Sequence, residues 1–338
     1  MATSRDNITM RTIAKEAGVS LASVSRVLSG SAHTSADVRD KVLSVSKALG
    51  YMPSLTGKMS LSKDSKLIGL VANQIPGSYV ASIEAAASAA GYDLLLTATN
   101  YDPDKEDRAI ISMLNRRVDG LILRSGREEY PAYLLERMKS VPVVFITGSF
   151  QGLPREKVIT VDNRYGSAIG TRYLCELGHR KIAFFGRCTT VRTHLDRGEG
   201  YLDVCREYGI KPIFIDAPKP MVPYPERIEL AADYLRRFDL PSAVVCVSDN
   251  AALCFIQAAD SLGIRIPRDV SVLGFDNQTF AAIDRINLTT LRLPQAEASE
   301  AAVRWIKNVT EETPQENQKS VERFLPELIA RGSCMKIN

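Results

Sequence analysis

The feature that most constrains the fold is an alternation, from residue 67 onward, of short apolar runs with amphipathic stretches. The runs are Leu67–Ala72, Asp93–Ala98, Gly120–Leu123, Val141–Ile146, Val158–Val161, Lys181–Gly186, Pro212–Ile215, Ala243–Val247 and Val270–Phe275. Continuous runs rich in β-branched residues predict strands buried on both faces of a parallel sheet. Their alternation with helix-like segments indicates repeated βαβ units. The runs are numerous enough for two sheets, so we expect a body of two doubly wound α/β lobes.

The first 50 residues have a different pattern, which predicts an all-α head of three short helices. Their expected caps and ranges are Thr9 with Met10–Ala17, Ser20 with Leu21–Ser29, and Ser35 with Ala36–Leu49; Gly18, Gly30 and Gly50 follow them. Polar caps and terminal glycines are helix start and stop signals. The turn Gly18-Val19-Ser20 gives the layout of a helix-turn-helix. A shared core is expected from Ile13, Ala17, Val19, Val24, Leu28, Val38, Val42 and Val45.

These patterns predict three segments. Residues 1–52 form the head, residues 53–66 a linker with Pro53 and Gly57, and residues 67–338 the body. Within the body we expect an N-lobe of about 67–161 and 291–323. The C-lobe then comprises about 162–290 and 324–338.

The charge of the chain is concentrated in the head. Residues 1–65 hold nine Lys/Arg and five Asp/Glu, an excess that equals the formal net charge of +4 for the whole chain. A basic head on a neutral body suits a polyanion such as DNA, whereas the alternative is an ordinary solvated surface.

The second predicted helix has the residue types that read DNA. If Val24 faces the core, Leu21, Ala22, Ser25 and Arg26 remain exposed. Arg26 could donate two hydrogen bonds to guanine, and Leu21 could pack on a thymine methyl group. Ser20 and Ser25 could hold phosphates, which fix the register without reading sequence.

The same residues carry a resemblance to a known family. They are Ile13–Ser20, Val24–Leu28, Val38-Arg39 and Ala48–Pro53 in the head, and Leu67–Gly69, Val118–Ile122, Val161–Asn163, Leu177–Ala183, Arg197, Gly200-Tyr201, Asp269–Asp276 and Phe324–Ser333 in the body. The chain resembles the lactose-repressor (LacI/GalR) family of bacterial transcriptional regulators over nearly its whole length. Thr193 beside Arg192 is similar to the loop of gluconate-type repressors. The resemblance implies a homodimer on a pseudo-palindromic operator, with a body like periplasmic sugar-binding proteins that carries the effector site and the dimer contacts.

The resemblance also implies a set of DNA contacts. With those above, they are Thr9, Met10, Ser20, Leu21, Ala22, Ser25, Arg26, His33, Ser35, Tyr51, Lys58 and Leu61. In the family the linker forms a hinge helix whose leucine wedges into the minor groove. This chain has Gly57 and Ser60 at the usual alanine and leucine positions, and Leu61 one place later. Either the hinge forms in a shifted register that uses Leu61, or the wedge is weak.

Candidate effector-binding residues follow the predicted strands, because ligands of doubly wound folds bind beyond the carboxyl ends of strands. They are Asn73, Arg124, Thr193, Arg197, Ser248, Asp249, Phe275 and Asp276. The resemblance places Arg197 and Asp276 at the main ligand-gripping positions; the alternative is a structural salt bridge across the cleft. Phe275 could form a wall of the site or pack in the core. The further arginines at 127, 187 and 192 favour an effector with a carboxylate or phosphate, so a sugar, sugar acid or sugar phosphate is expected.

Two other classes of protein fit the sequence less well. An NAD-dependent enzyme is disfavoured because no GxGxxG follows the first strand of either lobe, and no HExxH, GxSxG or P-loop occurs. We therefore expect no enzyme activity, cofactor or metal. We interpret His194 as a solvated loop residue; the alternative is a contact with the ligand. A secreted sugar-binding protein would need a signal peptide and would lack the head. The scattered cysteines and the absence of a spanning segment predict free thiols in a cytoplasmic protein that has no membrane partner.

Overall fold

The computed structural model describes residues 9–28, 34–49, 65–74, 77–125, 127, 129–148, 150–220, 222–311 and 321–337. They fall in two compact units, Met1–Ser65 and Lys66–Asn338, which we call the head and the body. Nearly all of the predicted hinge, including Gly57, Lys58, Ser60 and Leu61, lies outside the described residues, as do His33 and Tyr51.

The head contains three helices, α1 (Met10–Ala17), α2 (Leu21–Leu28) and α3 (Ala36–Ala48). The Thr9 side chain accepts a hydrogen bond from the Thr12 amide, and Gly18 ends α1 in the left-handed conformation at φ +65°. The Ser20 hydroxyl likewise accepts from the Ser23 amide at 3.1 Å, which caps α2 as predicted. The buried core is Ile13, Ala17, Val24, Val27 and Val42; the other predicted core residues, Val19, Leu28, Val38 and Val45, pack against it.

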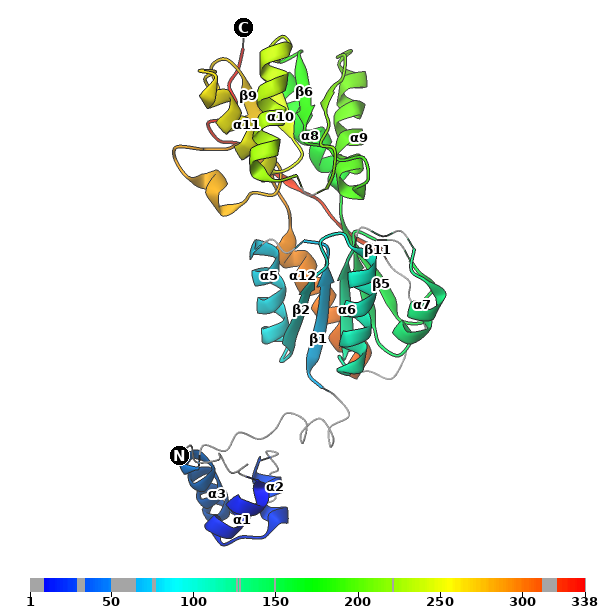
Figure 1. Cartoon of the computed structure of the whole chain (residues 1–338), viewed down its shortest axis with the longest axis vertical. Helices are drawn as coiled ribbons and strands as arrows, with labels where there is room; N and C mark the ends of the chain where they lie inside the picture. The colour runs from blue at the N-terminus through cyan, green and yellow to red at the C-terminus, as the bar shows by residue number, and fades with distance from the viewer. Residues whose placement is uncertain are drawn as a thin grey trace, which may run out of the picture. The chain divides into compact units, whose positions relative to one another are not determined.

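The first lobe of the body is a parallel sheet with the strand order β11-β5-β4-β3-β1-β2 (Figure 1). Its strands are β1 (Leu67–Ala72), β2 (Asp93–Ala98), β3 (Gly120–Arg124), β4 (Val143–Ile146), β5 (Glu156–Val161) and β11 (Val321–Phe324). Its helices are α5 (Gly77–Ala89), α6 (Pro103–Asn115), α7 (Ala132–Met138) and α12 (Gln295–Glu311).

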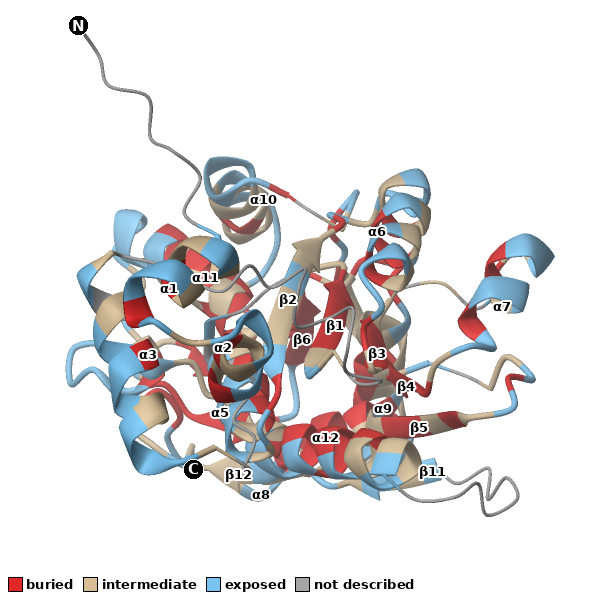
Figure 2. Ribbon diagram, turned by 90° about the horizontal axis from the view of Figure 1, so that it is seen from below, coloured by how far each residue is buried: buried red, intermediate tan, exposed pale blue. Residues whose placement is uncertain are grey.

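Successive residues of β1 pack on opposite faces of this sheet. Ile68 and Leu70 belong to the core shared with α5 and α12, whereas Val71 belongs to the core shared with α6 and α7. Figure 2 shows the resulting burial along β1, β3 and α12. Because both faces of the sheet are covered, nearly every residue of β1 is apolar, and the sequence shows a continuous apolar run there.

The second lobe repeats this plan with a parallel sheet in the order β7-β6-β8-β9. Its strands are β6 (Ile182–Phe185), β7 (Ile213–Ile215), β8 (Ala243–Cys246) and β9 (Ser271–Leu273), and η1 (Thr279–Ala282) is a short 3₁₀ helix. Its helices are α8 (Asn163–Glu176), α9 (Arg192–Glu207), α10 (Tyr224–Arg237) and α11 (Asp249–Ser261). The predicted fold class, a helix-turn-helix head and a body of two parallel α/β lobes, is therefore confirmed. The six cysteines are free and buried, as predicted.

The chain passes between the lobes more than once. β5 belongs to the first sheet and α8 follows it at once into the second lobe. Later, β10 (Thr290–Arg292) and β12 (Glu327–Ile329) pair antiparallel, while α12 and β11 between them belong to the first lobe. The apolar-run pattern did not predict β10, β11 or β12, because these three- and four-residue strands contain charged residues.

Close packing of α8 on α9 depends on Gly200. A Cβ atom there would lie 2.0 Å from the Arg164 carbonyl oxygen and 3.0 Å from the Ala168 amide nitrogen. Both are backbone atoms of α8, so neither can move without displacing the helix. In contrast, a Cβ at Gly198 on the same helix would first meet a side-chain atom of Arg187, at 3.0 Å.

Gly200→Ala should therefore lower the free energy of unfolding of the body by ~1–3 kcal/mol, the usual cost of overpacking. Gly198→Ala is the matched control and should cost clearly less, because the Arg187 side chain can yield. Urea unfolding followed by circular dichroism measures both. Equal stabilities of the two variants would contradict this account of the helix contact.

Candidate functional site

The α2 helix presents one apolar and one polar side. Val24 and Val27 are buried, while Leu21 is 44% exposed and Ala22 and Arg26 are exposed. The Arg26 Nε donates to the Ala22 carbonyl at 3.2 Å, so the guanidinium lies back along the helix. An exposed, short-chained helix start followed by an arginine has the form of a helix that enters a DNA major groove.

The other predicted DNA contacts surround α2 in the described part of the head. Ser20 and Thr9 are exposed at the starts of α2 and α1, and Ser35 is exposed just before α3. Ser25 is half-buried, and Met10 packs against the head core. Hydroxyl groups at helix starts are suited to phosphate contacts.

The predicted effector residues of the second lobe gather around Arg197, which is 7% exposed. Its Nε donates to Asn163 Oδ1 at 2.8 Å and its Nη1 to the Val247 carbonyl at 2.5 Å. Its Nη2 donates to Asp276 Oδ1 at 3.3 Å. Burial lowers the pKa of Arg197, and the Asp276 carboxylate opposes that shift. The guanidinium is thus fixed in orientation from three sides.

Phe275 and Asp276 complete this group at the end of the second sheet. The Phe275 ring is buried in the lobe core, and its centroid lies 3.7 Å from the Cζ atom of Arg197. Phe275 therefore packs in the core, one of its two predicted roles, and also supports the guanidinium; a wall of the ligand site stays a prediction. Burial raises the pKa of Asp276, while Arg197 and Arg124 lower it. Asp276 has φ +118°, which is unusual for a residue other than glycine. This conformation sets the direction of the chain in the turn after β9.

Asp249 and Ser248 lie beside this group but have partners within the protein. Asp249 is fully buried, and its two oxygens accept hydrogen bonds from Thr290 Oγ1 and the Gln278 amide, both at 2.6 Å. Burial and the nearby Asp276 raise its pKa to about 6. Ser248 caps α11 by accepting from the Ala251 amide at 3.2 Å. Asp249 thus shapes the loop after β9.

The first lobe contributes Asn73 and Arg124 from the ends of β1 and β3. The Asn73 side chain accepts from the Gln74 amide at 2.8 Å, and Arg124 Nη1 donates to the Gln74 carbonyl at 3.2 Å. The Arg124 guanidinium lies 5.1 Å from the centre of the Tyr79 ring. Among the described residues Arg124 has no carboxylate within ion-pair distance, although its charge acts on Asp276 across the cleft.

The other arginines that were expected to add positive charge are neutralised. Arg127 pairs with Asp107, and Arg187 donates twice to Asp216, at 2.8 Å each. Arg192 pairs with Asp196 at 3.0 Å. The expected surplus of guanidinium groups is therefore reduced, in the described residues, to Arg124.

Three residues near the cleft were not among the predicted contacts. Asn163 follows the run that forms β5 and holds Arg197, so the rule that selected the other residues could have found it. Tyr101 follows β2. Burial raises the pKa of Tyr101, and the nearby charges of Arg124 and Arg197 partly oppose that rise. His194 lies in the first turn of α9 and accepts a hydrogen bond from the Cys188 amide at 3.1 Å. The interpretation of His194 as a solvated loop residue is therefore wrong, because the residue is helical and hydrogen-bonded. Thr193, the residue before His194, is half-buried.

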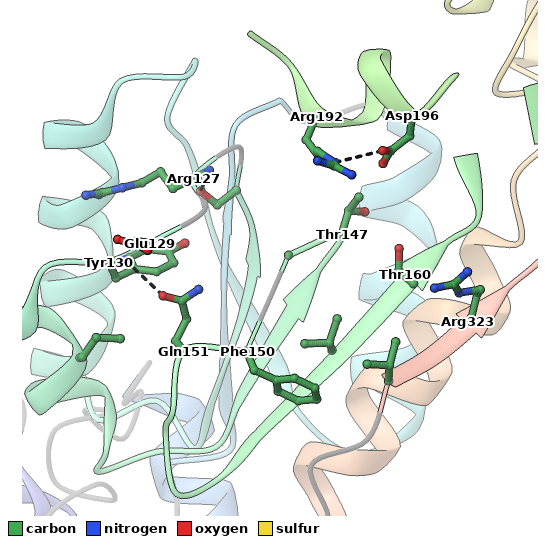
Figure 3. A pocket seen from close by; sticks show the side chains of 15 residues that line it. Arg127, Glu129, Tyr130, Thr147, Phe150, Gln151, Thr160, Arg192, Asp196 and Arg323 are labelled. Carbon is green, nitrogen blue, oxygen red and sulfur yellow. Dashed lines mark hydrogen bonds and ion pairs between the residues drawn. The ribbon is translucent and has the colours of Figure 1, made fainter. Parts of the chain in front are cut away.

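A pocket of about 870 Å³ lies next to this cleft, at the ends of β3, β4 and β5 (Figure 3). Ser125 lines it directly after Arg124, and Asp196 lines it directly before Arg197. Within the described residues no cluster of His, Cys, Asp and Glu could hold a metal ion. No helix in the same residues combines the length and apolar content needed to cross a bilayer.

Comparison with protein families gives two matches. Residues 9–54 match the model of bacterial regulatory proteins of the lacI family. Residues 171–334 match the model of a periplasmic binding protein-like domain.

Individual proteins match over nearly the full length. The HTH-type transcriptional repressor PurR of Erwinia tasmaniensis is 31% identical over 338 residues, which covers 96% of both chains. Catabolite control protein A of Priestia megaterium is 29% identical over 316 residues, 91% of this chain and 94% of the relative. The lac repressor dimer bound to operator and an anti-inducer has a TM-score of 0.81 at 23% identity, and covers 98% of this chain and 100% of its own.

The environment of His194 makes a prediction about pH. Burial, with the charges of Arg197 and Arg227, lowers its pKa from 6.5 to about 3. Because the folded state binds the proton more weakly than the unfolded state, the contribution of His194 to stability is complete above pH 6.5 and is lost as the pH falls toward 3. The free energy of unfolding of His194→Gln should accordingly fall less steeply than that of the wild type over this range. Urea titrations between pH 4 and 7 measure the two slopes, and parallel slopes would contradict the assignment.

Proposed function

The chain belongs to the lacI family of bacterial regulatory proteins. We propose that it is a homodimeric repressor that binds a palindromic operator, and that a bound sugar acid sets its affinity for that operator. Its relatives are DNA-binding regulators of transcription and not enzymes, and the same is true of this chain. We further propose that this repressor acts in the cytoplasm.

The observation that carries the DNA-binding half is the exposed start of α2. Leu21, Ala22 and Arg26 face away from the head core, and only side chains in such positions can reach base edges. Thr9, Ser20, Ser25 and Ser35 would hold phosphates, with Met10 beside them. His33, Tyr51, Lys58 and Leu61 are proposed contacts from the family resemblance alone, since they lie outside the described residues.

The edge of the first sheet supports the homodimer. β2 pairs with β1 on one side and is the last strand of the sheet on the other. Leu96 of this strand is 39% exposed, and Leu94 and Leu95 are only partly covered. Long apolar edge strands are liable to pair with another chain unless they are covered. A second copy of this chain would cover the edge, with the small exposed residues of the adjacent α5 allowing close approach.

The effector half is supported by the chemistry of the cleft. Arg197 and Asp276 together present donors and an acceptor, an arrangement that can bind neighbouring hydroxyl groups of a sugar. Arg124 faces them as a cation without an ion-pair partner among the described residues, so it is suited to the carboxylate of a sugar acid. Asn73, Thr193 and Ser248 would add polar contacts, while Phe275 and Asp249 position Arg197 and the loop. The division into the N-lobe and C-lobe given above belongs to the same proposal.

The DNA-binding half predicts a specific loss in Arg26→Ala. An operator is first selected from random duplexes with the purified full chain. At fixed salt concentration, the variant should bind that operator with ~1–3 kcal/mol less free energy, about 5- to 150-fold, and should lose preference at one base pair in each half-site. Lys41→Ala, an exposed basic residue of α3, is the control and should keep the sequence preference.

The second half of the experiment adds hexonates and hexuronates to the operator complex. At least one should change the operator affinity, because a ligand that binds two lobe arrangements unequally must shift DNA binding. An equal loss of affinity for all duplexes in Arg26→Ala would refute the reading role. A response to neutral sugars alone would refute the sugar-acid class.

A further inference from the structure

The pocket beside the Arg197 cleft has features of a second binding site, and we call it the N-lobe pocket. It is lined by Tyr130, Thr147, Phe150, Thr160, Arg192 and Arg323, among others. Figure 3 shows Arg192 and Asp196 of α9 facing Thr147 and Thr160 of the first lobe across it. Its volume of about 870 Å³ falls in the range of roughly 300–1,000 Å³ that is typical of small-molecule sites.

The pocket lies at the same edge of the first sheet as the proposed ligand cleft. The cleft uses Arg124 at the end of β3, and the pocket uses Ser125 next to it, then Thr147 after β4 and Thr160 in β5. From the second lobe, α9 contributes Arg197 to the cleft and Asp196 to the pocket. A ligand with one ring at Arg197 would therefore lie close to residues that line the pocket.

The polar groups of the pocket are ion pairs rather than single charges. Arg192 pairs with Asp196 at 3.0 Å and Arg323 with Asp162 at 3.2 Å, and both arginine side chains are exposed. Arg127 pairs with Asp107. Such pairs offer guanidinium donors beside carboxylate acceptors without a net charge, an arrangement that suits hydroxyl groups better than an anion.

Apolar surface completes the lining. Phe150 lies at the edge of the pocket in Figure 3, and Val321 of β11, 51% exposed, also lines it. The opposite wall is held in place because the Tyr130 hydroxyl donates to the buried Glu106 at 2.6 Å. Sugar rings have apolar faces and hydroxyl edges, and a pocket that combines apolar side chains with a few oriented polar groups matches both.

We propose that the N-lobe pocket holds a second, neutral sugar ring, so that the effector is an acidic disaccharide whose carboxylate-bearing residue lies at Arg124 and Arg197. This inference rests on the proposed function, because it takes the Arg197 cleft as the site of the sugar acid. It narrows the effector class to an aldonate or uronate that carries one neutral glycosyl group.

Calorimetry on the full chain tests the proposal with two sets of probes. One set is gluconate, galacturonate and glucuronate; the other is cellobionate, maltobionate and lactobionate, each a gluconate bearing a neutral hexose. At least one of the three disaccharide acids should bind ~10-fold or more tightly than the best monosaccharide acid.

Two variants fill the pocket independently. Thr160→Trp blocks it from β5 and Val321→Trp from β11, and each should reduce the affinity for the disaccharide acid to that for the monosaccharide acid, with the latter unchanged. Ser112→Trp, at an exposed position of α6 away from the pocket, is the control and should retain the difference. The use of two positions keeps the test valid if one variant fails to fold.

The outcomes separate this inference from the proposed function. If monosaccharide acids bind and no disaccharide acid binds more tightly, the proposed function stands and the second subsite is refuted. Equal losses for both probe sets in the two pocket variants would also refute it. If no acid of either set binds while the operator is still recognised, the sugar-acid cleft is refuted and the subsite with it.

Discussion

The proposed ligand-binding side of the body depends on one buried cation, the guanidinium of Arg197. Burial of an unpaired charge is too costly to persist, so its position is dictated by its partners. Those partners are Asn163 at the start of α8, the Val247 carbonyl after β8 and Asp276 after β9. One side chain of α9 thus joins a second helix and the ends of two strands. The Phe275 ring packs against the Arg197 guanidinium. These internal bonds already fix the floor of the proposed cleft, which would lower the cost of binding a ligand there.

Much of this architecture could be read from the sequence because burial on both faces leaves a continuous apolar signal. β1 and β2 have the predicted ends. The residues at or soon after the strand ends include Arg124, the last residue of β3, and Asp276, which follows β9; the charge of Arg124 acts on Asp276. The helix-turn-helix was equally visible, since its caps are local: Thr9 and Ser20 bond to amides three residues later.

Features that depend on partners distant in the sequence could not be predicted. Arg127 and Arg187 were expected to add positive charge, but their carboxylate partners are 20 and 29 residues away. The strand-end rule could have placed Asn163 near the site, but its hydrogen bond to Arg197 required knowledge that α9 packs against α8. The strand β11 alternates exposed and half-buried residues and contains Glu322 and Arg323, so no apolar run marks it. Because Arg127 and Arg187 are paired with carboxylates, the cleft does not have the expected general excess of cations. Among the described residues it has one cation without an ion-pair partner, Arg124, near the ion pair of Arg197 and Asp276.

Arg197 and its partners are proposed to sense the effector and thereby to set operator affinity. Operator affinity of Arg197→Lys, measured with and without the sugar acid that acts on the wild type, tests this most directly. Lysine keeps the charge but cannot donate to Asn163, Val247 and Asp276 in the fixed geometry of a guanidinium. The account predicts a folded variant that binds the operator as the wild type does but no longer responds to the effector. An unchanged response would contradict it.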